Sequence, residues 1–195
     1  RTMGDIDLLV KPKDYEYAVD CLLNLGCIET SSKSDLIMGR HRCFDYNEVS
    51  IELHYYFSFF DDIKKANELD ELLYNAISSN NSELPDDENG LVLLSHIGQH
   101  LKGGLGLRHI IDWMMFVHTC LDDTAWHSSF SEKAQKCGLE TLAKTTTKMC
   151  QMYLGLKNDN LTWCENANAE LCDSLMLHVL ECGNLGKSRN ILQSS

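Results

Sequence analysis

Carboxylates near the start of the chain follow a pattern that suits a divalent-metal site. Residues 4–10 read Gly-Asp-Ile-Asp-Leu-Leu-Val. Because side chains alternate between the two faces of a strand, we expect Asp5 and Asp7 on one face and Ile6 in the core, with 8–10 continuing as a buried strand. Two such carboxylates repel each other unless a cation lies between them, and their oxygen atoms suit Mg²⁺ or Mn²⁺. We therefore predict that Asp5 and Asp7 bind a divalent metal.

A third carboxylate stands in a second apolar stretch, where residues 49–54 read Val-Ser-Ile-Glu-Leu-His. Glu52 lies between two apolar residues, as in a strand with one buried face, and could extend from a strand next to the first. Three converging carboxylates form the metal site that phosphoryl or nucleotidyl transfer requires. His54 shares the face of Glu52 and either orients it, contacts an acceptor or lies at the rim. The alternative for the carboxylates is a solvated strand end without metal.

The elements around these residues are predicted to form a small sheet. Pro12 suits a first helical turn and Gly26 a helix C-terminal cap. Two strands flank the turn Asn47-Glu48 and predict an antiparallel hairpin. The expected strands lie at residues 5–10, 27–30, 40–46 and 49–57.

From about residue 60 the apolar residues recur at helical spacing. The predicted fold class is α+β, with a small mixed sheet and flanking helices followed by an all-helical bundle. Residues 103–106, which are rich in glycine, are read as a turn between helices. Further helices are expected at 124–137, 139–154 and 167–182. The predicted domains are 1–60 for the sheet, 61–182 for the bundle and 183–195 for a flexible tail.

Two histidines of the helical region, His96 and His100, are spaced i, i+4 and share one helix face. That spacing can bind zinc, but Ile97 stands where a zinc protease has its glutamate, which argues against that enzyme class. The alternative is a helix surface exposed to water. Arg108 and Asp112 have the same spacing and are expected to form a surface ion pair.

These motifs together resemble the uncharacterised nucleotidyltransferase family of bacteria, within the superfamily that includes DNA polymerase beta and the aminoglycoside nucleotidyltransferases. The residues that carry the likeness are Arg1, 4–10, Glu52-Leu53-His54, His96, His100, Arg108 and Asp112, and it covers roughly residues 1–155. The resemblance implies a nucleotidyltransferase-like sheet. It also implies that a Gly-Ser turn and a helix precede the Asp-x-Asp strand in the complete domain.

By this resemblance, the reaction is transfer of a nucleoside monophosphate from a nucleoside triphosphate, such as ATP, to a small acceptor, most simply a hydroxyl. Mg²⁺ or Mn²⁺ is the implied cofactor. Asp5 and Asp7 would hold the metal at the triphosphate, and Glu52 would bind a second metal or help to deprotonate the acceptor. The residues implied in nucleotide or acceptor binding are His54, His96, His100, Lys102 and Asp112.

The amino-acid composition argues against nucleic acid and membrane as binding partners. The net charge is −12, with 17 basic against 29 acidic residues, whereas nucleic-acid binding requires clustered Lys and Arg. No apolar run approaches the roughly 20 residues that span a membrane. The nine cysteines include no Cys-x-x-Cys pair and suit a reduced cytoplasm. We expect a cytoplasmic protein that binds neither nucleic acid nor membrane. The rival class is a non-catalytic helical interaction module with a degenerate transferase domain.

Overall fold

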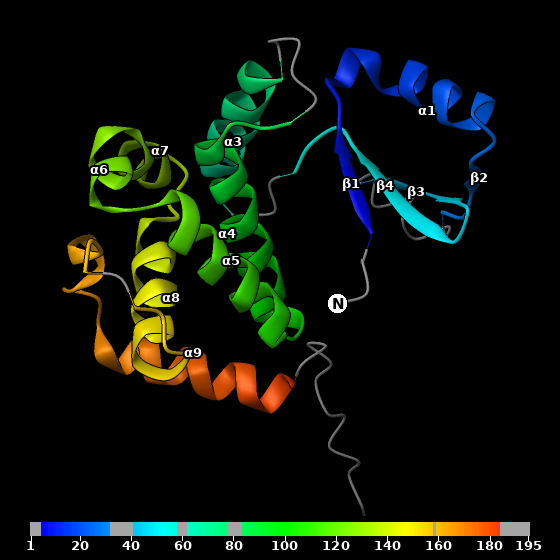
Figure 1. Ribbon diagram of the computed structural model, residues 1–195. Coiled ribbons are helices and arrows are strands. Elements are labelled where there is room, and N and C mark those ends of the chain that lie inside the picture. The colour runs from blue at the N-terminus through cyan, green and yellow to red at the C-terminus, as the bar shows by residue number, and fades with distance from the viewer. Residues whose placement is uncertain (1–4, 32–40, 58–61, 78–82, 158, 184–195) are drawn as a thin grey trace, which may run out of the picture. The chain divides into compact units, whose positions relative to one another are not determined.

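The computed structural model describes residues 5–31, 41–57, 62–77, 83–157 and 159–183. It contains two compact units (Figure 1). The sheet unit comprises residues 1–58 and 70–82, and the helical unit comprises residues 59–69 and 83–195. A four-stranded mixed sheet and many helices confirm the predicted α+β class. The expected tail at 183–195 lies outside the described residues, apart from Gly183.

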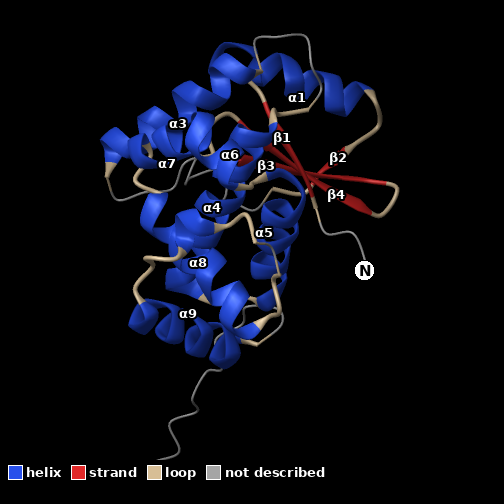
Figure 2. Cartoon of the chain, turned by 60° about the vertical axis from the view of Figure 1, so that its left-hand side comes forward, coloured by secondary structure: helices blue, strands red, loops and turns tan. Residues whose placement is uncertain are grey.

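The sheet unit has the strand order β1-β4-β3-β2, in which β1 is parallel to β4 and the other pairs are antiparallel. A short 3₁₀ turn and helix α1 connect β1 to β2 (Figure 2). The bounds are β1 Ile6–Leu9, η1 Pro12–Asp14, α1 Tyr15–Asn24, β2 Ile28–Glu29, β3 His41–Tyr46 and β4 Val49–His54. The predicted strand–helix unit and hairpin are therefore confirmed.

The hairpin between β3 and β4 turns at Asn47 and Glu48, whose φ angles are 48° and 67°. Two successive positive φ angles characterise the two-residue turn that matches the twist of paired strands. The turn fixes the register of the hairpin, so Tyr46 pairs with Val49 and His41 pairs with His54. One face of these strands packs on α1 and forms the core of the unit. Its buried members are Val19, Leu22, Cys27, Phe44, Ile51 and Leu53.

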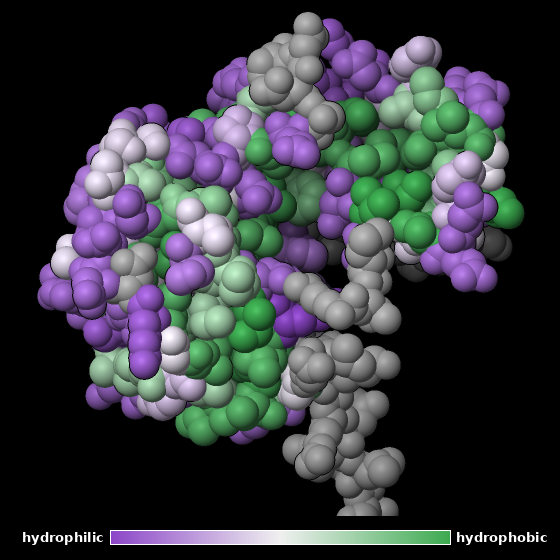
Figure 3. Space-filling view, in the orientation of Figure 1, coloured by the Kyte–Doolittle hydropathy of each residue, from purple (hydrophilic) through white to green (hydrophobic). Residues whose placement is uncertain are grey.

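The first strand departs from the sequence expectation. Ile6 and Leu8 were expected in a buried strand, but they are 39% and 37% exposed. The reason is that β1 lies at the edge of the sheet, whereas the buried side chains of α1 pack on β3 and β4. Figure 3 shows the resulting apolar side chains gathered over β1 and β4.

The helical unit is built on consecutive packing of α4 on α5, α5 on α8 and α8 on α9 (Figure 2). Helix α3 spans Ile63–Ala76 and contributes to both units. The other elements are α4 Asp86–Gly103, α5 Leu107–Cys120, α6 Asp123–Ala125, η2 Trp126–Phe130, α7 Ser131–Lys136, α8 Glu140–Tyr153, η3 Thr162–Cys164 and α9 Ala169–Cys182. None of the helices in the described ranges is long and apolar enough to cross a membrane.

Two features tie the helical unit together. The expected helix at 124–137 is a continuous helical run from α6 to α7 with a π turn, η2, in its middle. Trp126 of that turn stacks on Trp163, with ring centroids 4.0 Å apart and planes 5° from parallel.

Most of the cysteines are buried, as expected of small apolar side chains.

The close approach of α4 to two phenylalanines requires a glycine. A Cβ atom on Gly90 would lie 2.5 Å from Phe116 Cζ and 2.7 Å from Phe130 Cε2. Phe130 is fully buried and Phe116 is 7% exposed, so neither ring can move without disturbing the core. Gly90 therefore sets how closely α4 packs against α5 and η2.

We predict that Gly90→Ala lowers the free energy of unfolding by about 1–3 kcal/mol, the usual result of overpacking a core. Alanine favours a helix over glycine by about 1 kcal/mol, so propensity alone predicts the opposite sign. Gly103→Ala is the matched control, because its Cβ would have nothing within 4 Å. Urea denaturation of both variants measures the difference. A Gly90→Ala protein as stable as the parent would contradict this packing.

Candidate functional site

The polar face of the sheet carries the predicted carboxylates. In the parallel pairing of β1 with β4, Asp7 stands opposite Glu52. In the antiparallel pairing of β3 with β4, His41 stands opposite His54. Partners across a ladder share a face, and Glu52 and His54 share one by alternation. All four side chains therefore lie on the face opposite the buried Ile51.

His54 is the centre of this group. Its Nε2 atom lies 2.9 Å from Asp7 Oδ1 and 3.4 Å from Glu52 Oε2. His41 Nε2 lies 3.7 Å from the same oxygen of Glu52. Phe57 packs on the His54 ring with a centroid distance of 4.6 Å, which helps to explain why only 12% of the His54 side chain is exposed. Two carboxylates from different strands thus converge on one nitrogen atom.

The electrostatics of the group follow from this geometry. Burial lowers the pKa of His54, but the hydrogen bonds and charges of Asp7 and Glu52 outweigh it and raise the pKa above the ordinary 6.5. The hydrogen bond from His54 lowers the pKa of Glu52, and the charge of His41 also lowers it. Burial acts to raise this pKa but is outweighed. Glu52 is therefore held as a carboxylate beside an imidazole that favours its protonated form.

The structure places the predicted residues of the sheet unit as follows. Asp7, Glu52 and His54 are brought together, and Asp5 is not part of their contacts, since it is exposed and lies one position before β1. His41 was missed. Counting outward from the turn Asn47-Glu48 would have placed it opposite His54, because a two-residue turn fixes every later pair.

The same face offers ligands for a cation. His41, Glu52 and His54 each supply one ligand atom, and these atoms lie within 4.8 Å of one another. Asp7 and Glu52 add oxygen ligands that suit Mg²⁺ or Mn²⁺, whereas the imidazoles suit transition metals. The residues present fit a divalent cation, which would take the place of the proton on His54.

The helical unit carries the other predicted residues. His96, His100 and Lys102 lie on α4, and Asp112 lies on α5. Lys102 is exposed, whereas the other three are half-buried. A residue that the sequence did not single out, His109 of α5, joins the two histidines: its ring stacks on His100 with centroids 4.3 Å apart. The sequence could not predict this contact, because the glycine-rich turn between α4 and α5 has no regular period that would show which residues of the two helices meet.

His100 and His109 have lowered pKa values. Burial, together with the nearby His100, His96 and Arg108, lowers the pKa of His109 to about 4, although hydrogen bonding at Gly106 acts to raise it. Burial also lowers the pKa of His100, with His96 and Arg108 acting in the same direction. Both rings are therefore neutral near pH 7.

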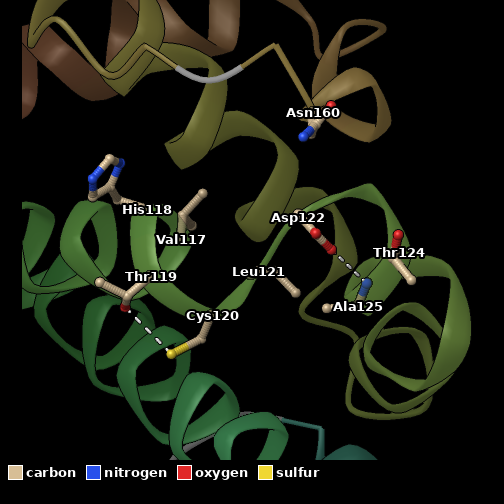
Figure 4. Close-up of a pocket in the computed structure, with 9 residues that line it drawn as sticks. All are labelled: Val117, His118, Thr119, Cys120, Leu121, Asp122, Thr124, Ala125 and Asn160. Carbon is tan, nitrogen blue, oxygen red and sulfur yellow. Dashed lines mark hydrogen bonds between the residues drawn. The ribbon is translucent and has the colours of Figure 1, made fainter.

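A surface pocket of about 500 Å³ lies where α5 ends, but its polar groups serve the local fold (Figure 4). Asp122 Oδ1 accepts a hydrogen bond from the Ala125 backbone and caps α6. The Thr119 hydroxyl donates to the Met115 carbonyl within α5. None of the predicted site residues lines this pocket, and we assign it no chemistry.

We predict that Asp7→Asn lowers the pKa of His54, because the variant removes the negative charge that stabilises the imidazolium. The titration of the His54 ring can be followed by NMR in metal-free protein, with His54→Gln for assignment. Asp45→Asn, an exposed position of the same hairpin, should leave the titration unchanged.

The same interaction predicts a pH-dependent stability. Since the folded pKa of His54 exceeds 6.5, the stabilisation is complete below pH 6.5 and is lost as the pH rises through the folded pKa. The stability difference between the parent and Asp7→Asn should shrink over that range. An unchanged His54 pKa in Asp7→Asn would refute the assigned contact.

Comparison with known proteins agrees with the resemblance drawn from the motifs. The family described as "Uncharacterised nucleotidyltransferase" matches residues 1–155, which include the whole sheet and helices α4 and α5. No curated protein and no solved structure matches the chain. The match spans most of the 195 residues and both groups of predicted site residues. The chain belongs to the uncharacterised nucleotidyltransferase family, and its general role is that of an enzyme of nucleotidyl transfer.

Proposed function

We propose that this enzyme transfers a nucleoside monophosphate from a nucleoside triphosphate to the hydroxyl of a small acceptor, with Mg²⁺ or Mn²⁺ as cofactor. The observation that carries the proposal is the convergence of Asp7 and Glu52 on one atom, His54 Nε2. A point that attracts two carboxylates from separate strands is suited to a cation. The family supplies the reaction class, and the geometry supports the metal dependence.

The residues proposed to hold the metal are Asp5, Asp7 and Glu52. Asp5 precedes Asp7 by two positions, so strand alternation directs both toward the same face. When bound, a divalent cation would neutralise the triphosphate oxygens and the charge that develops on the leaving pyrophosphate. Asp7 and Glu52 already stand on adjacent strands at the same level of the sheet, which leaves little reorganisation for binding.

The state of Glu52 bears on the two roles that the sequence left open. A carboxylate with a lowered pKa is a weak proton acceptor and a good ligand for a cation. This supports a role for Glu52 mainly as a ligand. His54 is proposed to orient both carboxylates through its ring nitrogen, as a positioning residue.

The acceptor is proposed to be small and not a polynucleotide. A net charge of −12 opposes the binding of a phosphate backbone, which depends on Lys and Arg. A single triphosphate carries its own cation and needs few basic side chains. We propose as further contacts to nucleotide or acceptor the residues Lys102, His96, His100 and Asp112.

Glu52→Gln should lower kcat by about 10²-fold or more, the scale expected when a group that acts in the transition state is removed. The change keeps the shape of the side chain, so the melting temperature should stay close to that of the parent. Glu48→Gln is the matched control, since Glu48 is exposed in the turn of the same hairpin. Single-turnover release of pyrophosphate measures the effect. Turnover at the parental rate in Glu52→Gln would exclude Glu52 from the site.

Asp7→Asn should lose cooperative binding of metal and nucleotide. Titration calorimetry of Mn²⁺ in the presence of a nucleoside triphosphate should show a clear signal in the parent and a much weaker one in Asp7→Asn and Asp5→Asn. Asp45→Asn should bind as the parent does. If Asp7→Asn keeps the parental metal affinity, the carboxylate site is wrong.

A further inference from the structure

We propose that His96, His100 and His109 form a second metal centre, which binds one Zn²⁺ ion inside the helical unit. This proposal does not rest on nucleotidyl transfer at the sheet. It assigns a common partner to three side chains that two separate helices bring together.

The geometry is that of a preassembled ligand group. His96 and His100 share one face of α4, and His109 comes from the first turn of α5. The centroid distances are 5.0 Å between His96 and His100, 5.4 Å between His96 and His109, and 4.3 Å between His100 and His109. One nitrogen from each ring lies within 4.8 Å of the other two.

Closing this group on an ion needs only small side-chain rotations. Zn–N bonds of about 2.0–2.1 Å in a tetrahedral site place ligand nitrogens roughly 3.3 Å apart. The three nitrogens already lie within 4.8 Å of one another. Each ring therefore has to shift by about an ångström, which small rotations about its side-chain bonds can supply. The helix backbones can stay where Gly90 and the core hold them.

The turn between α4 and α5 supplies the outer contacts that a metal-binding histidine needs. His109 Nδ1 lies 3.3 Å from the Gly106 carbonyl oxygen, and because a carbonyl only accepts, Nδ1 carries the proton. Nε2 of His109 is then left with its lone pair for a metal. His100 has a hydrogen bond with the backbone of Gly104, whose φ is 119°. Such second contacts orient imidazole ligands and fix their tautomers.

The surroundings leave the three rings within reach of an ion. Leu94 and Ile97, from the same stretch of α4, are fully or almost fully buried, so the aliphatic side chains of this helix fill the core. His96 and His100, by contrast, are half-buried on the same helix and keep part of their surface open to solvent. An ion that enters from solvent can therefore meet one ligand atom from each of the three rings.

The ligand set selects the class of metal. Neutral imidazoles suit Zn²⁺ and its transition-metal neighbours, whereas Mg²⁺ prefers oxygen. Three protein ligands leave a fourth position for water or for an oxygen atom of a bound molecule, as in zinc sites that do chemistry. The site would therefore keep Zn²⁺ in the presence of the Mg²⁺ proposed for the sheet.

The test is a Zn²⁺ titration by calorimetry in excess Mg²⁺, on the full chain carrying Glu52→Gln and His54→Gln. These two changes remove two of the three ligands of the sheet group and leave only His41, so that the sheet no longer offers a competing three-ligand site. We expect one Zn²⁺ per chain. His109→Gln should weaken binding by at least about a hundredfold, more than loss of an outer contact causes. His118→Gln, an exposed position of α5, is the matched control and should bind as its parent does.

Two further measurements keep the result decisive. Because His109 is buried, His96→Gln provides a second, half-buried variant, and circular dichroism of the metal-free proteins shows whether each one folds. Substitution with Co²⁺ should give the visible bands of nitrogen coordination, without the strong near-ultraviolet band of cysteine thiolate. Parental Zn²⁺ affinity in folded His96→Gln or His109→Gln, or a thiolate band in the Co²⁺ spectrum, would overturn the proposal.

Discussion

The parallel pairing of β1 with β4 is the constraint on which the candidate site depends. It places Asp7 beside Glu52, although the two residues are far apart in the chain. The hairpin then brings His41 beside His54 through a turn that only one register satisfies. Since side chains alternate strictly along a strand, a slip of one residue would send Glu52 into the core and Ile51 into the site. Backbone hydrogen bonding thus decides which side chains meet.

A steric constraint has the same function in the helical unit. The absence of a side chain on Gly90 lets α4 approach Phe116 and Phe130. The buried turn at 104–106 then reverses the chain within a few residues, so the last turns of α4 face the first turn of α5. His100 and His109 stack as a result. In both units the contact between polar groups depends on a local backbone requirement. In the sheet unit it is two successive positive φ angles, and in the helical unit it is the absence of a Cβ atom.

Much of the sheet could be predicted from the sequence because its rules are local. Alternation predicted the shared face of Glu52 and His54, and the Asn47-Glu48 turn predicted the hairpin. The exposure of Ile6 could not be predicted, since it depends on strand order, which places β1 at the edge. His109 was out of reach for a related reason: its partners lie across a turn whose path no periodicity encodes.

The positions of the tryptophans, which include the stacked Trp126 and Trp163, have a consequence for optical studies of this protein. All three tryptophans of the chain belong to the helical unit, whereas every tyrosine except Tyr153 belongs to the sheet unit. Emission excited selectively from tryptophan therefore follows the helical unit and is blind to the sheet. Tyrosine absorbance follows the sheet unit almost alone. Each half of the molecule carries its own chromophore, so a spectrometer can distinguish one cooperative unfolding transition from two without any label.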